Sequence, residues 1–248
     1  MSMPRKICCA VEAITDHGGR VYTVDLAPAS PVPSFRPGQF LHLTVDDYDP
    51  SSFWPESRVF SIVNSPRERR RIRLCYSVKG RYTTKMEQTL KIGGTVWIKL
   101  PYGEFMIDGA SDAVLLAGGT GISAFTAFIE GLKPEHLRPV WLVYGARNPA
   151  LFLFCDMILD QLAQVPNFHV LFFTEAADAA FAGQMAALPR APACLTGRIS
   201  IDPVWPRVPV AANTVFYLSG PPIMLTTLTA QLKAHGVAPD RVRTDAWE

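Results

Sequence analysis

The chain has 248 residues, and its 24 lysines and arginines against 22 aspartates and glutamates give a formal net charge of +2, which argues against bulk nucleic-acid binding. This length is enough for one large domain or two small ones, each with its own core. Residues 1–16 lack the pattern of a signal peptide and no run approaches the roughly 18 apolar residues of a membrane span, so we expect a cytoplasmic protein.

The first half of the chain is typical of short strands. Its segments are rich in branched and aromatic residues and are punctuated by Pro and Gly. A helix is expected at residues 83–90, ahead of a Gly-Gly turn. Short strands separated by turns predict an antiparallel barrel or sandwich. The expected strands are Val21–Leu26, Phe40–Val45, Arg58–Ile62, Ile72–Tyr76 and Val96–Leu100.

The strand that begins at Arg58 carries polar groups suited to a nucleotide cofactor. Alternation places Arg58 and Phe60 on one face and Val59 and Ser61 on the other. A guanidinium can pair with a diphosphate through two parallel N–H donors. A serine hydroxyl can hydrogen-bond a flavin ring nitrogen, and Phe60 can pack on that ring. The same pattern also fits a surface arginine beside a core phenylalanine, so both interpretations stay open.

Two further segments of this half have alternative interpretations. In the segment from Gly80 to Met86, Thr83 or Thr84 is expected either to cap a helix or to donate to a phosphate at its N-terminus. The basic run Arg67–Arg71 is expected to be the solvated tip of a hairpin. Its functional alternative is a docking patch for an acidic electron acceptor.

The second half changes to near-continuous apolar runs, as expected of strands that are covered on both faces. Helical spacing alternates with these runs, which predicts a doubly wound parallel sheet. We place the domain boundary in the polar stretch 108–112 and expect residues 176–193 to be irregular or partly helical. The expected strands are Val114–Ala117, Val140–Tyr144, Val170–Phe173 and Val215–Leu218. The apolar stripes are Phe125, Phe128, Ile129 and Leu132; Leu151, Phe154, Ile158 and Leu162; and Leu225, Leu228 and Leu232.

A glycine cluster follows the first of these runs. Gly118, Gly119, Thr120 and Gly121 stand between a buried strand and an amphipathic helix. Glycine lets backbone N–H groups approach a pyrophosphate, so this segment predicts a phosphate-binding loop. The five cysteines and five histidines are scattered without ligand spacing, so no metal site or iron–sulfur cluster is expected.

Seven segments, in this order, resemble the ferredoxin–NADP reductase superfamily. They are Pro37–Phe40, Arg58–Ser61, Gly80–Thr84, Pro101–Phe105, Gly118–Ile122, Tyr144–Arg147 and Ser219–Pro221. The resemblance covers the chain from about Lys6 to Trp247. It implies a two-domain fold, in which an antiparallel β-barrel that binds FAD (residues 1–109) precedes a doubly wound α/β domain that binds NAD(P) (residues 110–248).

The resemblance also implies roles for particular residues. Ser219 stands where the family often has cysteine beside the nicotinamide, and Trp247 is a candidate ring cover near the C-terminus. The implied catalytic set is Ser61, Ser219, Asp245 and Trp247. The implied flavin-binding set is Arg58, Val59, Phe60, Ser61, Ile62, Val78, Gly80, Tyr82, Thr83 and Thr84. The implied nicotinamide-binding set is Gly118, Gly119, Thr120, Gly121, Arg147, Glu175, Gly220 and Pro221.

The expected activity is transfer of a hydride from NADH to bound FAD, followed by electron transfer to an external acceptor such as a ferredoxin, an oxygenase component or a quinone. Glu175 would repel the 2′-phosphate of NADPH, which favours NADH, with NADPH as the alternative. FMN remains open beside FAD. The other functions left open are an electron-transfer subunit of a larger complex and a reductase that uses free flavin as substrate.

Overall fold

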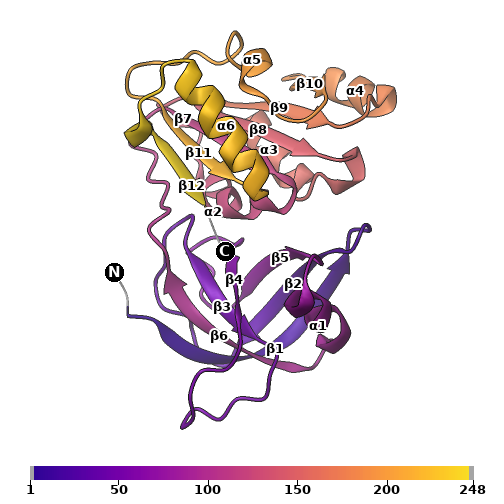
Figure 1. Cartoon of the computed structure of the whole chain (residues 1–248), viewed down its shortest axis with the longest axis vertical. Coiled ribbons are helices and arrows are strands. Elements are labelled where there is room, and N and C mark those ends of the chain that lie inside the picture. Colours follow the sequence, from indigo (N-terminus) through magenta and orange to yellow (C-terminus); the bar gives the residue numbers. More distant parts are fainter. Residues whose placement is uncertain (1–2, 246–248) are drawn as a thin grey trace. The chain divides into compact units, whose positions relative to one another are not determined.

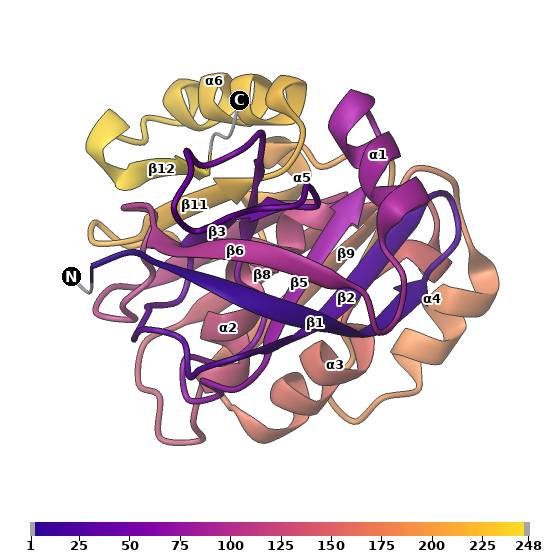
Figure 2. The same ribbon diagram turned by 90° about the horizontal axis from the view of Figure 1, so that it is seen from below.

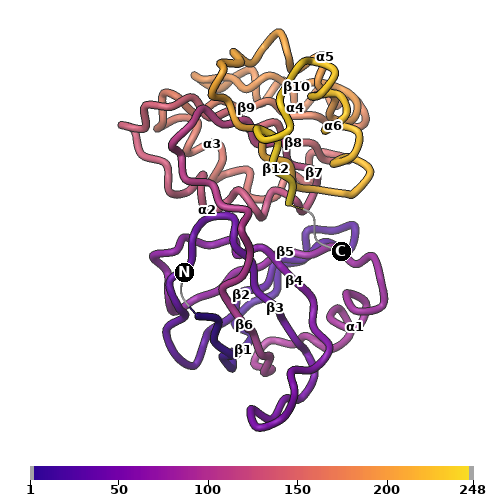
Figure 3. Tube along the Cα trace, turned by 60° about the vertical axis from the view of Figure 1, so that its left-hand side comes forward, coloured from indigo at the N-terminus to yellow at the C-terminus, as the bar shows by residue number. Residues whose placement is uncertain are grey.

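Two six-stranded sheets of opposite type organise the chain (Figure 1). The computed structural model describes residues 3–245. The first sheet belongs to a barrel unit, residues 3–107 together with Thr126–Phe128, and the second to an α/β unit, which holds Asp108–Phe125 and the residues from Ile129 onward. Figure 3 follows the chain through both units. Within the described residues, no helix has the length and apolarity needed to cross a bilayer.

The barrel unit is antiparallel, with strand order β4-β3-β6-β1-β2-β5. The end strands β4 and β5 lie next to one another, so the sheet is nearly closed. Its elements are β1 (Arg5–Asp16), β2 (Val21–Pro28), β3 (Phe40–Thr44), β4 (Arg58–Ser61), β5 (Ile72–Ser77), α1 (Arg81–Thr89) and β6 (Thr95–Tyr102). All five expected strands are present, and the expected helix begins two residues earlier than predicted.

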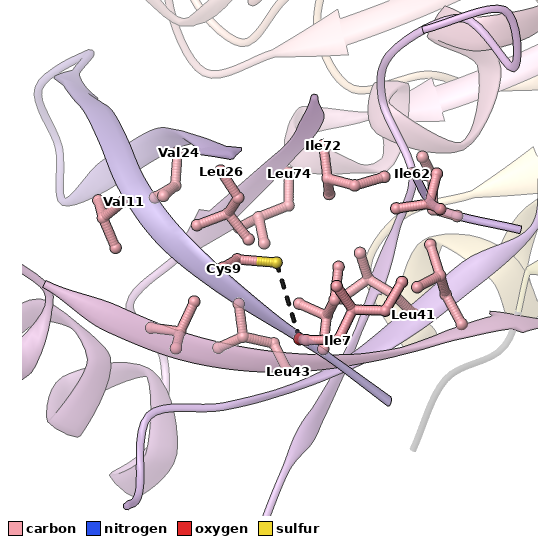
Figure 4. Close-up of a cluster of buried hydrophobic side chains, with 14 of the residues drawn as sticks. Ile7, Cys9, Val11, Val24, Leu26, Leu41, Leu43, Ile62, Ile72 and Leu74 are labelled. Carbon is pink, nitrogen blue, oxygen red and sulfur yellow. Dashed lines mark hydrogen bonds between the residues drawn. The ribbon is translucent and has the colours of Figure 1, made fainter. Parts of the chain in front are cut away.

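Strand β1 was not expected from the sequence. Alternate residues of it, namely Ile7, Cys9 and Val11, are buried, and they pack with side chains of β2, β3 and β5 in the barrel core (Figure 4). Burial raises the pKa of the Cys9 thiol, so Cys9 remains an uncharged core side chain. The small residues between these positions conceal the alternation in the sequence.

The α/β unit has a wholly parallel sheet with strand order β10-β9-β8-β7-β11-β12. Helix α6 lies on one face of this sheet, and α2 and α3 lie on the other (Figure 2). The strands are β7 (Ala113–Gly118), β8 (Val140–Ala146), β9 (Phe168–Thr174), β10 (Ala193–Thr196), β11 (Val215–Ser219) and β12 (Val242–Asp245). The helices are α2 (Ser123–Gly131), α3 (Cys155–Gln164), α4 (Ala179–Ala186), α5 (Ile201–Val204) and α6 (Pro222–Ala234), with short 3-10 turns η1 (Gly119–Ile122), η2 (Pro149–Leu151) and η3 (Pro239–Arg241).

The order of these strands places a switch point in the middle of the sheet. From β7 the chain moves outward through β8, β9 and β10, and it then returns to the other side of β7 as β11. Ligands of open α/β sheets bind outside the carboxyl ends of the strands at such a switch point. The expected site of this unit is therefore the edge where β7 and β11 end.

One predicted helix differs from the sequence-based expectation. Leu151 lies in the η2 turn, and Phe154 adopts a left-handed backbone conformation with φ 58° as the residue that precedes α3. Only Ile158 and Leu162 of the expected stripe are buried on α3. The other two apolar residues fill a bent connection, which spacing alone cannot distinguish from a continuous helix.

Candidate functional site

In the barrel unit, Arg58 lies over the first turn of α1. Its guanidinium carbon is 5.3 Å from the ring centre of Tyr82, the second residue of that helix. Within residues 3–245, the Arg58 side chain donates only to the neighbouring Ser57 carbonyl, at 3.3 Å, and has no carboxylate partner. By contrast, Arg81 forms an ion pair with Glu56 at 2.8 Å. Arg58 therefore presents an uncompensated positive charge beside a helix N-terminus.

Tyr82 supports this arrangement from within the core. It is 2% exposed, and its hydroxyl donates to the Leu43 carbonyl at 2.9 Å and accepts from the Val45 amide at 3.3 Å. Burial raises the pKa of Tyr82, so the hydroxyl stays protonated as a donor. That Tyr82 contacts a cofactor stays a prediction, and its hydroxyl is already bonded inside the barrel. The Arg58 guanidinium lies over the Tyr82 ring, and the ring belongs to the core of the barrel.

The start of α1 also differs from expectation. The residue that caps α1 is Gly80, not Thr83 or Thr84. The Thr83 hydroxyl accepts from the amides of Lys79 and Gly80, at 2.9 and 3.1 Å, and donates to the Gly80 carbonyl. This hydroxyl is therefore occupied locally. The first backbone N–H groups of the helix have no partners inside it and remain available to an anion.

The remaining flavin-set residues divide between surface and core. Ser61 is buried and Phe60 is half-buried, with the Phe60 ring 6.2 Å from that of Tyr76. Val59 and Val78 are also half-buried. Ile62 is 1% exposed and belongs to the barrel core, so its side chain offers no surface to a ligand. Alternation is lost at the end of β4, where Ser61 and Ile62 are both buried, and the role of Ile62 in the flavin-binding set stays a prediction.

In the α/β unit, the glycine cluster sits at the switch-point edge. A Cβ on Gly121 would overlap the Ser219 carbonyl oxygen and lie 2.7 Å from the Gly220 nitrogen. A Cβ on Gly118 would lie 2.5 Å from the Met224 sulfur. These glycines allow the η1 turn to pack against the end of β11. Gly119 differs, because it has φ 55° and open space at its Cβ position.

Ser219 and Asp245 meet at the same edge. They end β11 and β12 as register partners, and the Ser219 hydroxyl donates to Asp245 Oδ2 at 2.9 Å. Both residues are buried, at 4% and 5% exposure. The carboxylate therefore orients the hydroxyl, which neither the 26-residue separation nor any motif indicates. Trp247, the expected ring cover, lies outside the described residues.

Four more residues of the nicotinamide set lie at strand ends or in the turns beyond them. Gly220, with φ 156°, and Pro221 lead from β11 into α6. Arg147 is exposed just after β8. Glu175 follows β9 and forms an ion pair with Arg198 at 3.4 Å. The sequence does not indicate this contact, because Arg198 and Glu175 meet only through the pairing of β9 with β10.

The chain matches the family model of the oxidoreductase NAD-binding domain over residues 115–229. It is 26% identical over 246 residues to the propane 2-monooxygenase reductase component of Mycolicibacterium smegmatis, which covers 96% of this chain and 66% of that protein. Over the first three curated relatives, the chain spans between 40% and 66% of their length.

Solved structures share the fold. The cytochrome P450 reductase GcoB of Amycolatopsis superposes with a TM-score of 0.78 at 22% identity, covering 98% of this chain and 69% of that one. The flavohemoglobin of Malassezia yamatoensis, solved with bound FAD and heme, gives a TM-score of 0.76 at 19% identity and covers 97% and 59%. At these identities the likeness concerns the two-domain architecture.

Proposed function

We propose that the chain belongs to the ferredoxin–NADP reductase superfamily and that it is a flavin-dependent NAD(P)H oxidoreductase. It takes a hydride from NADH onto FAD and passes electrons to an external acceptor. An oxygenase component or a ferredoxin is favoured over a quinone as this acceptor, because the chain is similar to an oxygenase reductase component. Because the chain spans only part of the length of such relatives, the identity of the acceptor is likewise proposed.

The barrel unit fits the diphosphate of FAD. Arg58 offers two parallel donors and the α1 N-terminus offers backbone N–H groups, and Tyr82 holds the two side by side. The first turn of α1 contains no acidic residue that would repel a phosphate. Ser61 and the half-buried Phe60, which end the same strand, would hold the flavin ring.

The α/β unit fits a nicotinamide dinucleotide. Gly119 leaves open space at the switch-point edge, and the close packing of Gly118 and Gly121 brings their turn to the end of β11. There the Asp245 carboxylate fixes the Ser219 hydroxyl, which would position the nicotinamide. When bound, the flavin supplies the redox chemistry by accepting a hydride and releasing electrons singly or in pairs. The chain contributes position and electrostatics.

A single observation carries this proposal: the buried Ser219–Asp245 pair stands at the switch point, beside a turn in which Gly118 and Gly121 leave no room for side chains. The test is a visible spectrum of the purified protein with identification of its flavin, repeated after NADH and after NADPH. We expect a yellow protein that bleaches with NADH and reduces ferricyanide. A colourless protein that neither binds added flavin nor oxidises NADH would refute the proposal. Flavin that is lost on dialysis yet is still reduced when added in excess would indicate the flavin-reductase alternative.

Ser219→Ala is expected to slow hydride transfer about tenfold, because loss of an oriented group misplaces the reacting ring. The flavin spectrum and the thermal midpoint should change little. Stopped-flow reduction by NADH measures the rate. Ser219→Cys should recover most of it, and Thr226→Ala, which removes an exposed hydroxyl of α6, serves as the control. An unchanged rate in Ser219→Ala would remove the positioning role.

Coenzyme choice depends on the Glu175–Arg198 pair. We propose that Glu175 accepts from the ribose hydroxyl of NADH and holds Arg198 in an ion pair, so that Arg198 does not serve a 2′-phosphate. The KM for NADH should therefore be below that for NADPH. Glu175→Gln should lower the ratio of the KM for NADPH to the KM for NADH about tenfold, because it removes a charge that repels the 2′-phosphate and frees Arg198 from its ion pair. A KM for NADPH at or below that for NADH in the parent protein would contradict this assignment.

A further inference from the structure

The basic run of the barrel unit is held in a defined shape. This arginine loop (Arg67–Arg71) connects β4 to β5, and the buried Asn64 anchors it. The Asn64 amide donates to the carbonyls of Glu68 and Arg71, at 3.2 and 2.9 Å, and its oxygen accepts from the Arg73 amide at 2.8 Å. An asparagine that is 4% exposed and satisfied in this way fixes the loop backbone.

A second anchor ties the loop to the segment before β3. Arg69 Nε donates to the Val32 carbonyl at 2.7 Å, and the Arg69 carbonyl accepts from the Val32 amide at 2.8 Å. At this anchor, Pro31 and the five loop residues line a shallow, open recess of about 550 Å³. The two anchors therefore fix the backbone of the residues that line this recess.

The charge of this recess is strongly positive. The loop has four arginines against one glutamate. Arg71 lies 3.7 Å from Asp25, but Arg73 already binds that carboxylate through two hydrogen bonds of 2.6 and 2.7 Å. Arg67 and Arg70 are exposed and form no ion pair within the described part of the chain. Two guanidinium groups therefore remain uncompensated on a rigid support.

We propose that the arginine loop is the docking surface for an acidic protein electron acceptor, an inference that rests on the proposed function. Several carboxylates on a protein surface match a cluster of guanidinium groups on an anchored backbone, because such pairs form parallel hydrogen bonds and the loop backbone needs no reordering. Exposed charges of this kind act mainly through long-range steering, which makes association fast and sensitive to salt.

The test compares two double charge reversals of equal size. Arg67→Glu/Arg70→Glu alters the loop, and Arg5→Glu/Lys91→Glu alters two exposed cations elsewhere in the same unit. The probe is an acidic [2Fe–2S] ferredoxin, whose dissociation constant is measured by calorimetry between 50 and 300 mM salt. A neutral quinone, menadione, serves as a small acceptor that does not respond to surface charge.

The loop variant should weaken ferredoxin binding at least about tenfold at low salt and flatten the salt dependence. Its rate ratio of ferredoxin to menadione should fall, and the control variant should match the parent in both measurements. Equal effects in the two variants, or none, would overturn the docking surface. Displacement of ferredoxin by millimolar phosphate alone would likewise overturn it, since the loop would then be a free-anion site. If NADH reduces neither acceptor, the proposed function fails, yet the binding comparison still decides the docking surface.

Discussion

Gly121→Ala is expected to destabilise the α/β unit by about 3 kcal/mol, because the added methyl group would meet backbone that cannot rotate away. The methyl carbon would overlap the Ser219 carbonyl and lie 2.7 Å from the Gly220 nitrogen. For a protein of this size, such a loss lowers the thermal midpoint by roughly 6–12 °C. Thermal unfolding followed by circular dichroism measures the shift, and NADH affinity should fall with it.

The matched control for Gly121→Ala is Gly119→Asn. Gly119 has open space at its Cβ position and φ 55°, a conformation that asparagine adopts more readily than most residues. The Gly119→Asn substitution should lower the free energy of unfolding by about 1 kcal/mol or less. Equal losses of stability in the two variants would show that the clash with β11 does not govern the glycine requirement. A thermal midpoint of Gly121→Ala equal to that of the parent would contradict the packing of the turn.

Arg58→Gln is expected to weaken FAD binding about 30- to 1,000-fold, because removing one partner of a close charge pair costs about 2–4 kcal/mol. The guanidinium of Arg58 is held over Tyr82 without a competing carboxylate, so its charge is fully available. The apparent dissociation constant can be measured by flavin fluorescence during titration of the apoprotein.

Arg81→Gln provides the comparison for Arg58→Gln. Arg81 is also at the start of α1, but its guanidinium is strongly exposed and pairs with Glu56. Loss of an exposed ion pair contributes little, so FAD affinity should change by less than about threefold. If both substitutions weaken FAD equally, general positive charge explains the effect. If Arg58→Gln binds FAD as well as the parent, Arg58 does not hold the diphosphate.

Sequence patterns predict most strands of both sheets. The segments that form β2 and β5 are rich in branched and aromatic residues, and the apolar runs of β7, β8, β9 and β11 are short, as is typical of buried strands and not of helices. The strands β10 and β12 lie at the sheet edges and are only four residues long, with largely exposed or half-buried side chains. Neither strand has an apolar run or a clear alternation, so the sequence does not predict these two strands.

The sequence by itself determined the two kinds of architecture and the segments that carry polar and glycine residues, because period-2 alternation, continuous apolar runs and glycine spacing are local properties. Only the tertiary structure decided which residues act together. Register between β11 and β12 joins Ser219 to Asp245, and packing places the Arg58 guanidinium over the buried ring of Tyr82. Such pairings depend on strand order and packing between distant segments, which no local pattern encodes.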